Sequence, residues 1–77
     1  MPHVIVKMVE GRTEAQKRAL ADAMVKALTT SLGCDEALVS VAIEDFRDED
    51  WMAKVYGPDI RDRPDTIYTM PGYGPDD

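Results

Sequence analysis

The residue with the clearest capacity for chemistry is Pro2, which directly follows the initiator methionine. When Met1 is removed, the proline nitrogen changes from an amide without basicity to a secondary amine at the chain terminus. A free α-amino group has a pKa of about 7.7–8.0, and burial or a neighbouring cation lowers that pKa toward neutrality. Proton transfer at neutral pH is fastest with such a base. The sequence therefore suggests Pro2 as a general base.

Two further residues are candidates for binding a substrate. Arg12 stands in the turn Glu10-Gly11-Arg12, and a guanidinium binds a carboxylate through two parallel hydrogen bonds. Residues 2–12 span at most about 30 Å when extended. We therefore expect Arg12 to reach the proline of a neighbouring subunit or the far end of a substrate. Trp51 offers an apolar wall to a pocket, although packing on a short helix explains its presence equally well.

The other reactive side chains fit structural roles. We expect His3 on a strand surface, Cys34 as a small, partly buried hydrophobe, and the acidic residues 48–50 as a solvated helix start. A chain with one histidine and one cysteine lacks the clustered ligands of a typical metal site, and it cannot form an internal disulfide. The sequence thus predicts no metal site.

Size and charge narrow the class of protein. A chain of 77 residues forms one domain, 1–77, and buries only about 60% of its unfolded surface, so association of copies is the remaining means of stabilisation. The net charge of −6 argues against binding nucleic acid through phosphate contacts. The sequence has neither an apolar run long enough to span a membrane nor a signal-peptide pattern. We expect a soluble, cytoplasmic protein.

The elements that must position these residues follow from the apolar periodicity. Residues 3–9 alternate as a strand, residues 14–32 form a helix, and residues 39–44 alternate as a second strand. Thr13 and Gln16 fit a capping box, and Gly33 fits the helix end. Strand, helix and strand predict a βαβ unit with parallel strands and a right-handed crossover. On the helix we expect one apolar stripe, made of Ala15, Ala19, Leu20, Ala23, Met24, Ala27, Leu28 and Leu32.

Shorter elements are expected after Phe46. The pattern predicts a short helix over residues 49–56, stopped by Gly57-Pro58, then a β-prone run over residues 66–69 and a turn-rich tail. The fold class is α+β, with a C-terminal hairpin or short helix added to the βαβ unit. Two strands and one helix leave one apolar sheet face uncovered, so we expect oligomerisation to complete the fold.

Taken together, these features resemble the 4-oxalocrotonate tautomerase family. The Met-Pro start, the segment Val9-Glu10-Gly11-Arg12-Thr13-Glu14-Ala15-Gln16-Lys17 and the βαβ order carry the resemblance over roughly the first fifty residues. It places Pro2 at the catalytic proline, Arg12 at the substrate-binding arginine and Trp51 at the aromatic pocket residue. The remainder, closing with Pro71-Gly72-Tyr73, is similar to a longer subgroup that includes homodimeric bacterial tautomerases active on phenylenolpyruvate-type enols.

One position departs from the family pattern. The second catalytic arginine of the family, on the second strand, falls at Ser40. Loss of that arginine favours a substrate with one carboxylate and an apolar or aromatic remainder, with Ser40 lining the substrate site. Lys54, Arg61 or Arg63 are candidates for supplying the lost charge.

The resemblance implies a tautomerase that isomerises a 2-hydroxydienoate or an arylenolpyruvate between enol and keto forms, with Pro2 as the base. It also implies a homodimer with a four-stranded sheet, a hexamer being the alternative. Two other hypotheses stay open. A hydratase or dehalogenase would use protonated Pro2 and a water activated by Glu10 or Glu44. A non-catalytic oligomer binding an acidic ligand or a protein partner would fit a chain that retains Met1.

Overall fold

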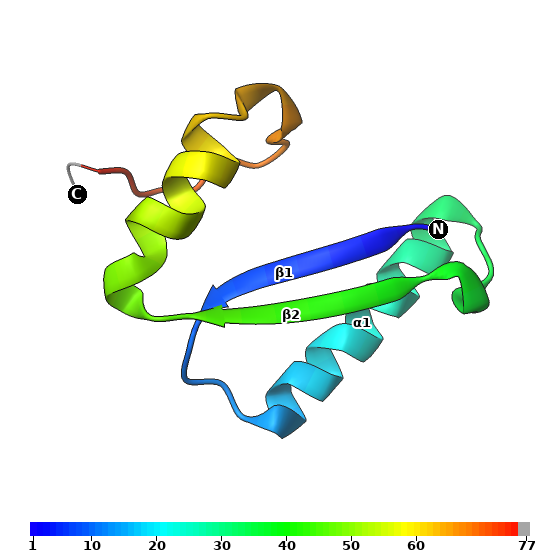
Figure 1. The fold of residues 1–77 in the computed structure, drawn as a ribbon. Helices are drawn as coiled ribbons and strands as arrows, with labels where there is room; N and C mark the ends of the chain where they lie inside the picture. The colour runs from blue at the N-terminus through cyan, green and yellow to red at the C-terminus, as the bar shows by residue number, and fades with distance from the viewer. Residues whose placement is uncertain (76–77) are drawn as a thin grey trace. The chain divides into compact units, whose positions relative to one another are not determined.

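The computed structural model describes residues 1–75, which form two compact units that divide at Phe46. The first unit contains the strand β1 (His3–Val9), the helix α1 (Glu14–Leu32) and most of the strand β2 (Ser40–Phe46) (Figure 1). The other elements are short: the 3-10 helices η1 (Glu36–Leu38), η2 (Asp48–Asp50) and η4 (Pro64–Thr66), and the π-helix η3 (Met52–Arg61).

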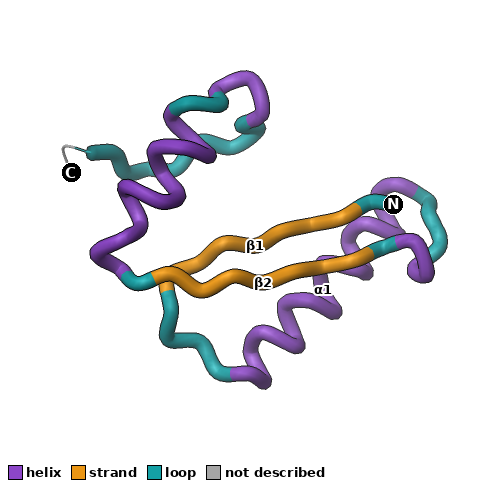
Figure 2. The backbone as a smooth tube through the Cα atoms, viewed as in Figure 1, coloured by secondary structure: helices purple, strands orange, loops and turns teal. Residues whose placement is uncertain are grey.

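Strands β1 and β2 lie side by side and run in the same direction, and α1 lies along one face of the sheet (Figures 1 and 2). Val41 and Ile43 line a groove together with α1 residues, so the odd-numbered residues of β2 face the helix. The side chains of His3 and Ser40 meet, which places both on the opposite face because strand residues alternate. The predicted parallel βαβ unit is confirmed, and Val4, Val6 and Met8 share the face toward α1.

Both ends of α1 carry the predicted caps. The Thr13 side chain accepts a hydrogen bond from the Gln16 amide at 3.1 Å, and the Gln16 side chain accepts one from the Thr13 amide at 2.9 Å. Gly33 adopts the left-handed conformation with φ +69°, and its N–H donates to the Thr29 carbonyl. Glycine takes this conformation without a Cβ penalty. The predicted capping box and C-terminal glycine are therefore confirmed.

The face of α1 that packs on the sheet differs from the predicted stripe. The half-buried apolar residues include Ala21 and Val25 beside the expected larger side chains, whereas the alanines at positions 15, 19, 23 and 27 are exposed and Leu32 is 62% exposed. The prediction counted small and large apolar residues alike. Most of the bulky apolar side chains turn toward the sheet, where they bury more apolar area than an alanine would, and Ala21 lies among them. The half-buried apolar set is Leu20, Ala21, Met24, Val25 and Leu28.

Beyond Phe46 the structure corrects two expectations. The helix does not stop at Gly57-Pro58 but continues through both residues to Arg61 as a π-helix, where the Asp62 N–H donates to the Gly57 carbonyl at 3.0 Å. A π-helix closes i→i+5 bonds, and the bond from Asp62 to Gly57 is of this kind, so helical hydrogen bonding continues beyond the proline. The β-prone run over residues 66–69 forms no strand within the described chain; its first residue ends η4.

The described residues contain very little core. Val55, 4% exposed, is the one buried hydrophobic residue among residues 1–75. Ile5 on the open sheet face is 52% exposed, and Leu38 before β2 is 51% exposed. So little buried apolar surface in a small chain agrees with the expectation that copies of it associate. None of the helices in the described part of the chain combines the length and the hydropathy needed to cross a membrane.

Candidate active site

Pro2 lies directly before β1, and one hydrogen bond from β2 fixes its backbone. Its carbonyl accepts a hydrogen bond from the Ser40 amide at 3.1 Å. One residue earlier, the terminal amine of Met1 donates to the Leu38 carbonyl. The first residue of β2 therefore lies beside Pro2, and the proline side chain is half-buried.

The side chains of His3 and Ser40 form a pair next to Pro2. The Nδ1 atom of His3 lies 2.6 Å from the Oγ atom of Ser40, and both residues are exposed. A serine hydroxyl both donates and accepts, and a neutral imidazole nitrogen does one or the other. The two side chains can therefore form further hydrogen bonds with a ligand or water on the open sheet face. Neither of them carries the permanent charge of an arginine. From the sequence, we predicted only that His3 lies on a strand surface. The pairing with Ser40 was not predictable, because a sequence pattern does not show which residue of β2 lies beside His3.

Arg12 lies at the opposite end of β1 from Pro2. It follows Gly11, whose φ of +127° is a conformation that favours glycine. The Arg12 guanidinium donates a hydrogen bond to the Val9 carbonyl at 3.4 Å. The seven residues of β1 rise by about 3.3 Å each, so the strand alone separates the two residues by roughly 20 Å. One chain therefore does not bring Arg12 to its own proline, in agreement with the distance expected from the sequence.

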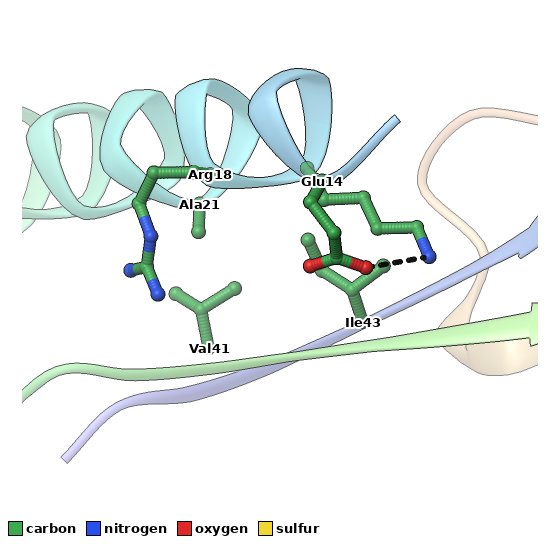
Figure 3. Close-up of a pocket in the computed structure, with 6 residues that line it drawn as sticks. Glu14, Arg18, Ala21, Val41 and Ile43 are labelled. Carbon is green, nitrogen blue, oxygen red and sulfur yellow. Dashed lines mark ion pairs between the residues drawn. The ribbon is translucent and has the colours of Figure 1, made fainter. Parts of the chain in front are cut away.

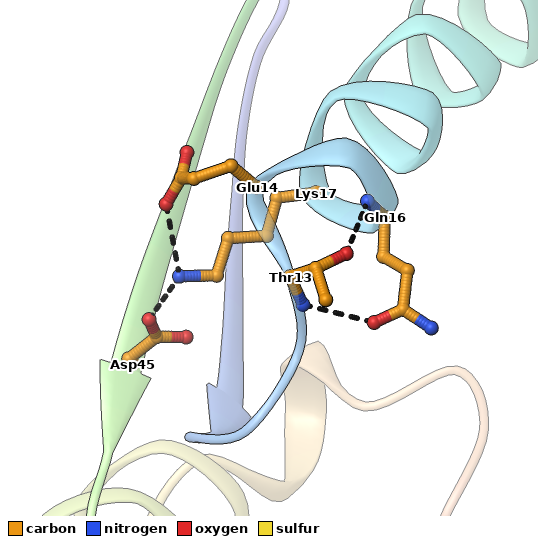
Figure 4. Close-up of polar contacts among 5 residues, drawn as sticks. All are labelled: Thr13, Glu14, Gln16, Lys17 and Asp45. Carbon is orange, nitrogen blue, oxygen red and sulfur yellow. Dashed lines mark hydrogen bonds and ion pairs between the residues drawn. The ribbon is translucent and has the colours of Figure 1, made fainter.

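A polar cluster joins the N-terminal end of α1 to the C-terminal end of β2. The Lys17 ammonium donates to the Asp45 carboxylate and lies 3.7 Å from the Glu14 carboxylate (Figure 4). The hydrogen bond to Asp45 raises the pKa of Lys17 above its ordinary value of 10.5. This contact connects residues that are 28 positions apart, and it helps to hold the helix on the sheet.

Beside this cluster, a groove of about 260 Å³ runs between α1 and β2. Figure 3 shows Arg18 and Glu14 extending from the helix on either side of Ala21, above Val41 and Ile43 of the strand. Its lining is polar along the helix and apolar along the strand. Pro2, Arg12, Ser40 and Trp51 are not among the residues that line it, so we assign the groove to the packing of the helix on the sheet.

Trp51 belongs to the second unit, where it forms part of an aromatic cluster. Its indole N–H donates to the Tyr73 hydroxyl at 2.7 Å. The Phe46 ring meets it edge-on, with centroids 6.3 Å apart and an interplanar angle of 82°. Trp51 itself is half-buried. The packing role considered for this residue is thus present, and Trp51 keeps part of its surface exposed.

Two of the candidates for supplying the charge of the second family arginine form ion pairs within their own unit. Lys54 donates to the Asp50 carboxylate at 3.4 Å, and Arg61 donates to that of Asp62 at 2.9 Å. Both pairs are exposed to solvent, where such pairs contribute little to stability. Engagement with a neighbouring acid makes Lys54 and Arg61 weaker candidates for binding a substrate anion.

The sequence matches the family model described as tautomerase enzyme over residues 2–58. A probable tautomerase of Xylella fastidiosa is 47% identical over 74 residues, which make up 96% of this chain and 90% of that protein. The tautomerase PptA of Cronobacter sakazakii is 35% identical over 74 residues, covering 95% of this chain and 97% of the relative. The 2-hydroxymuconate tautomerase of Bacillus subtilis is 45% identical over 47 residues, or 61% of this chain and 76% of the relative.

Solved structures show the same likeness in the fold. A 4-oxalocrotonate tautomerase isozyme from Methylibium petroleiphilum superposes with a TM-score of 0.63 at 36% identity, covering 65% of this chain and 81% of that one. TomN, a 4-oxalocrotonate tautomerase homologue of the tomaymycin biosynthetic pathway, gives a TM-score of 0.64 at 32% identity, with 65% and 77% covered. These structural matches cover about two thirds of the chain, whereas the first two sequence relatives match nearly all of it.

Proposed function

Because the chain belongs to the tautomerase family, and is thus an isomerase, we propose that it interconverts the enol and keto forms of a 2-keto acid with the amine of Pro2 as the base. The substrate class is a 2-hydroxydienoate or an arylenolpyruvate. The observation that carries this proposal is the position of Pro2 at the leading end of β1, hydrogen-bonded to Ser40 and followed by His3. Removal of Met1 would place a secondary amine at this point of the sheet.

The reaction needs one group that accepts and returns a proton. The amine of Pro2 takes the hydroxyl proton of the enol, and the oxygen forms the keto group as the electron pair of the C=C bond moves onto carbon. The resulting ammonium of Pro2 then gives a proton to that carbon, which completes a 1,3-shift and restores the base. The 2-keto acid delocalises the developing charge itself, so the reaction as written needs no cofactor.

We assign binding of the substrate carboxylate to Arg12. The length of β1 separates Arg12 from the proline of its own chain, so the arginine comes from a neighbouring copy. Both strands lie at an edge of the two-stranded sheet, and pairing of two chains would give a four-stranded sheet. A homodimer is the assembly we propose, and a hexamer built from such dimers is the alternative.

Ser40 and Trp51 determine which acid is accepted. The pair of Ser40 and His3 offers hydrogen bonds without the fixed positive charge of an arginine, so a second carboxylate gains less at this position. The exposed part of the Trp51 indole supplies an apolar surface for the remainder of the substrate. An arylenolpyruvate, with one carboxylate and one aromatic ring, fits this combination best.

The test is ketonisation of phenylenolpyruvate by protein whose intact mass shows that Met1 is absent. We expect catalysed turnover by this protein and loss of nearly all of it in Pro2→Ala. Pro75→Ala, at an exposed position near the other end of the chain, serves as the matched control and retains activity. Absence of turnover in the processed protein, or equal turnover with and without Pro2, would exclude the proposed base.

A further inference from the structure

The second unit contains a ring cluster that connects the C-terminal segment to Trp51. The Tyr73 hydroxyl accepts the indole N–H at 2.7 Å across 22 residues of sequence. The Tyr73 ring in turn lies against Tyr56, with centroids 5.7 Å apart and an angle of 46° between the rings. Phe46 contacts the indole edge-on at 6.3 Å. Trp51 is therefore held by one hydrogen bond and one aromatic contact.

These two contacts constrain different motions of the indole. An edge-on aromatic contact with Phe46 favours a particular tilt of the ring plane. The single polar group of the indole, its N–H, can only donate, so the bond to Tyr73 selects the direction in which that edge points. Tyr73 is 40% exposed, and its contact with Tyr56 keeps the hydroxyl in reach of Trp51. Without this hydroxyl, the indole N–H would turn to water.

We propose that Tyr73 is a positioning residue for Trp51, and that the C-terminal segment thereby sets the preference for an aromatic substrate. The inference rests on the proposed function, in which the indole surface receives the apolar part of the substrate. Tyr73 need not touch the substrate. It holds the indole in the one orientation that presents its face, which lowers the entropy lost when an aryl group binds there.

The experiment compares Tyr73→Phe with Tyr68→Phe in the full-length protein. Tyr73→Phe removes the hydroxyl and keeps the ring that contacts Tyr56. Tyr68→Phe makes the same chemical change at a side chain that is 99% exposed. Trp51 is the only tryptophan, so the emission maximum and acrylamide quenching of the protein report on this one indole. The kinetic comparison uses phenylenolpyruvate and 2-hydroxymuconate with each protein.

For Tyr73→Phe we expect a shifted emission maximum, stronger quenching, and a KM for phenylenolpyruvate raised about three- to ten-fold, the effect of one lost hydrogen bond. The KM for 2-hydroxymuconate and both kcat values should change less than two-fold, and Tyr68→Phe should match the wild-type protein. Emission and substrate preference that do not change in Tyr73→Phe would overturn the inference. The inference would also be overturned if Tyr73→Phe lost activity equally on both substrates and had a lower unfolding midpoint. That result would show that Tyr73 only stabilises the fold.

If the proposed function itself is wrong, the kinetic result differs from the one that rejects the role of Tyr73. A wild-type protein inactive on both substrates would overturn that function and, with it, the role of Tyr73 in substrate preference, whatever the emission spectra show. Active wild-type protein with unaltered Tyr73→Phe leaves the proposed function standing and rejects the role of Tyr73 alone.

Discussion

The imidazole Nδ1 of His3 lies 2.6 Å from the hydroxyl of Ser40, beside the hydrogen bond from the Ser40 amide to the Pro2 carbonyl. A single residue of β2 thus contacts two consecutive residues at the start of β1. The family resemblance places an arginine at position 40. In this chain, the uncharged Ser40 hydroxyl and its partner His3 stand where that guanidinium would begin. In the proposed site, this difference would change which acids are accepted.

Ser40→Arg should shift the preference of the enzyme toward a dicarboxylate. A guanidinium at position 40 offers charge-assisted hydrogen bonds to a second carboxylate, each worth roughly 1.5–3 kcal/mol. We expect the ratio of kcat/KM for 2-hydroxymuconate to that for phenylenolpyruvate to rise about ten-fold or more. Steady-state kinetics with both substrates measure the ratio. Ser31→Arg, at an exposed position near the end of α1, controls for added charge, and an equal rise in this control would reject the assignment of Ser40.

Mixing two inactive variants should restore activity if each site draws residues from two chains. Pro2→Ala lacks the base and Arg12→Ala lacks the carboxylate-binding group, but a mixed dimer contains one site with both intact. We expect each variant alone to lose most activity, and a mixture unfolded and refolded together to recover up to about a quarter of the wild-type rate, as random pairing of two chains in a C2 dimer predicts. Activity assays before and after mixing provide the measurement. Recovery no greater than that of Pro2→Ala refolded alone would reject the supply of Arg12 by a neighbouring copy.

Lys17→Met should destabilise the protein at neutral pH but not at strongly alkaline pH. The hydrogen bond to Asp45 raises the pKa of Lys17 above 10.5, so the folded state binds this proton more tightly than the unfolded state. The stabilisation is complete below pH 10.5 and is lost as the pH rises through the folded-state pKa. Urea unfolding of wild type and variant should therefore differ at neutral pH and converge well above pH 10.5. Lys26→Met, at an exposed position of the same helix, controls for loss of a surface charge. A difference that persists unchanged at high pH would argue against the pair.

Thr13→Ala should destabilise α1 at its start. The threonine side chain satisfies the Gln16 amide, and its own amide is satisfied by the Gln16 side chain. Replacing such an N-cap by alanine lowers stability by about 1 kcal/mol. Urea denaturation followed by circular dichroism measures the change. Thr30→Ala, an exposed residue within α1, makes the same substitution away from the cap, and a loss of stability in Thr30→Ala as large as in Thr13→Ala would show that the cap contributes nothing of its own.

Local patterns anticipated the elements of the first unit. The alternation over residues 3–9, the capping box at Thr13 and the glycine at position 33 are all short-range signals, and each appears in the structure as predicted. Two kinds of prediction were wrong. The sequence pattern did not distinguish small from large apolar residues on α1. The stop predicted at Gly57-Pro58 is absent, because the chain forms the π-helix η3 through both residues.

The sequence by itself determined the order of the elements and the candidate catalytic and binding residues. Apolar periodicity, helix caps and the Met-Pro start are short-range signals that a few neighbouring residues define. The sequence also bounded the distance between Pro2 and Arg12, since strand length follows from residue count. Only the tertiary structure decided that Ser40 lies beside His3 and that Tyr73 holds the indole of Trp51. Those contacts join residues 37 and 22 positions apart, and they depend on strand register and on how the chain folds back, neither of which any local pattern encodes.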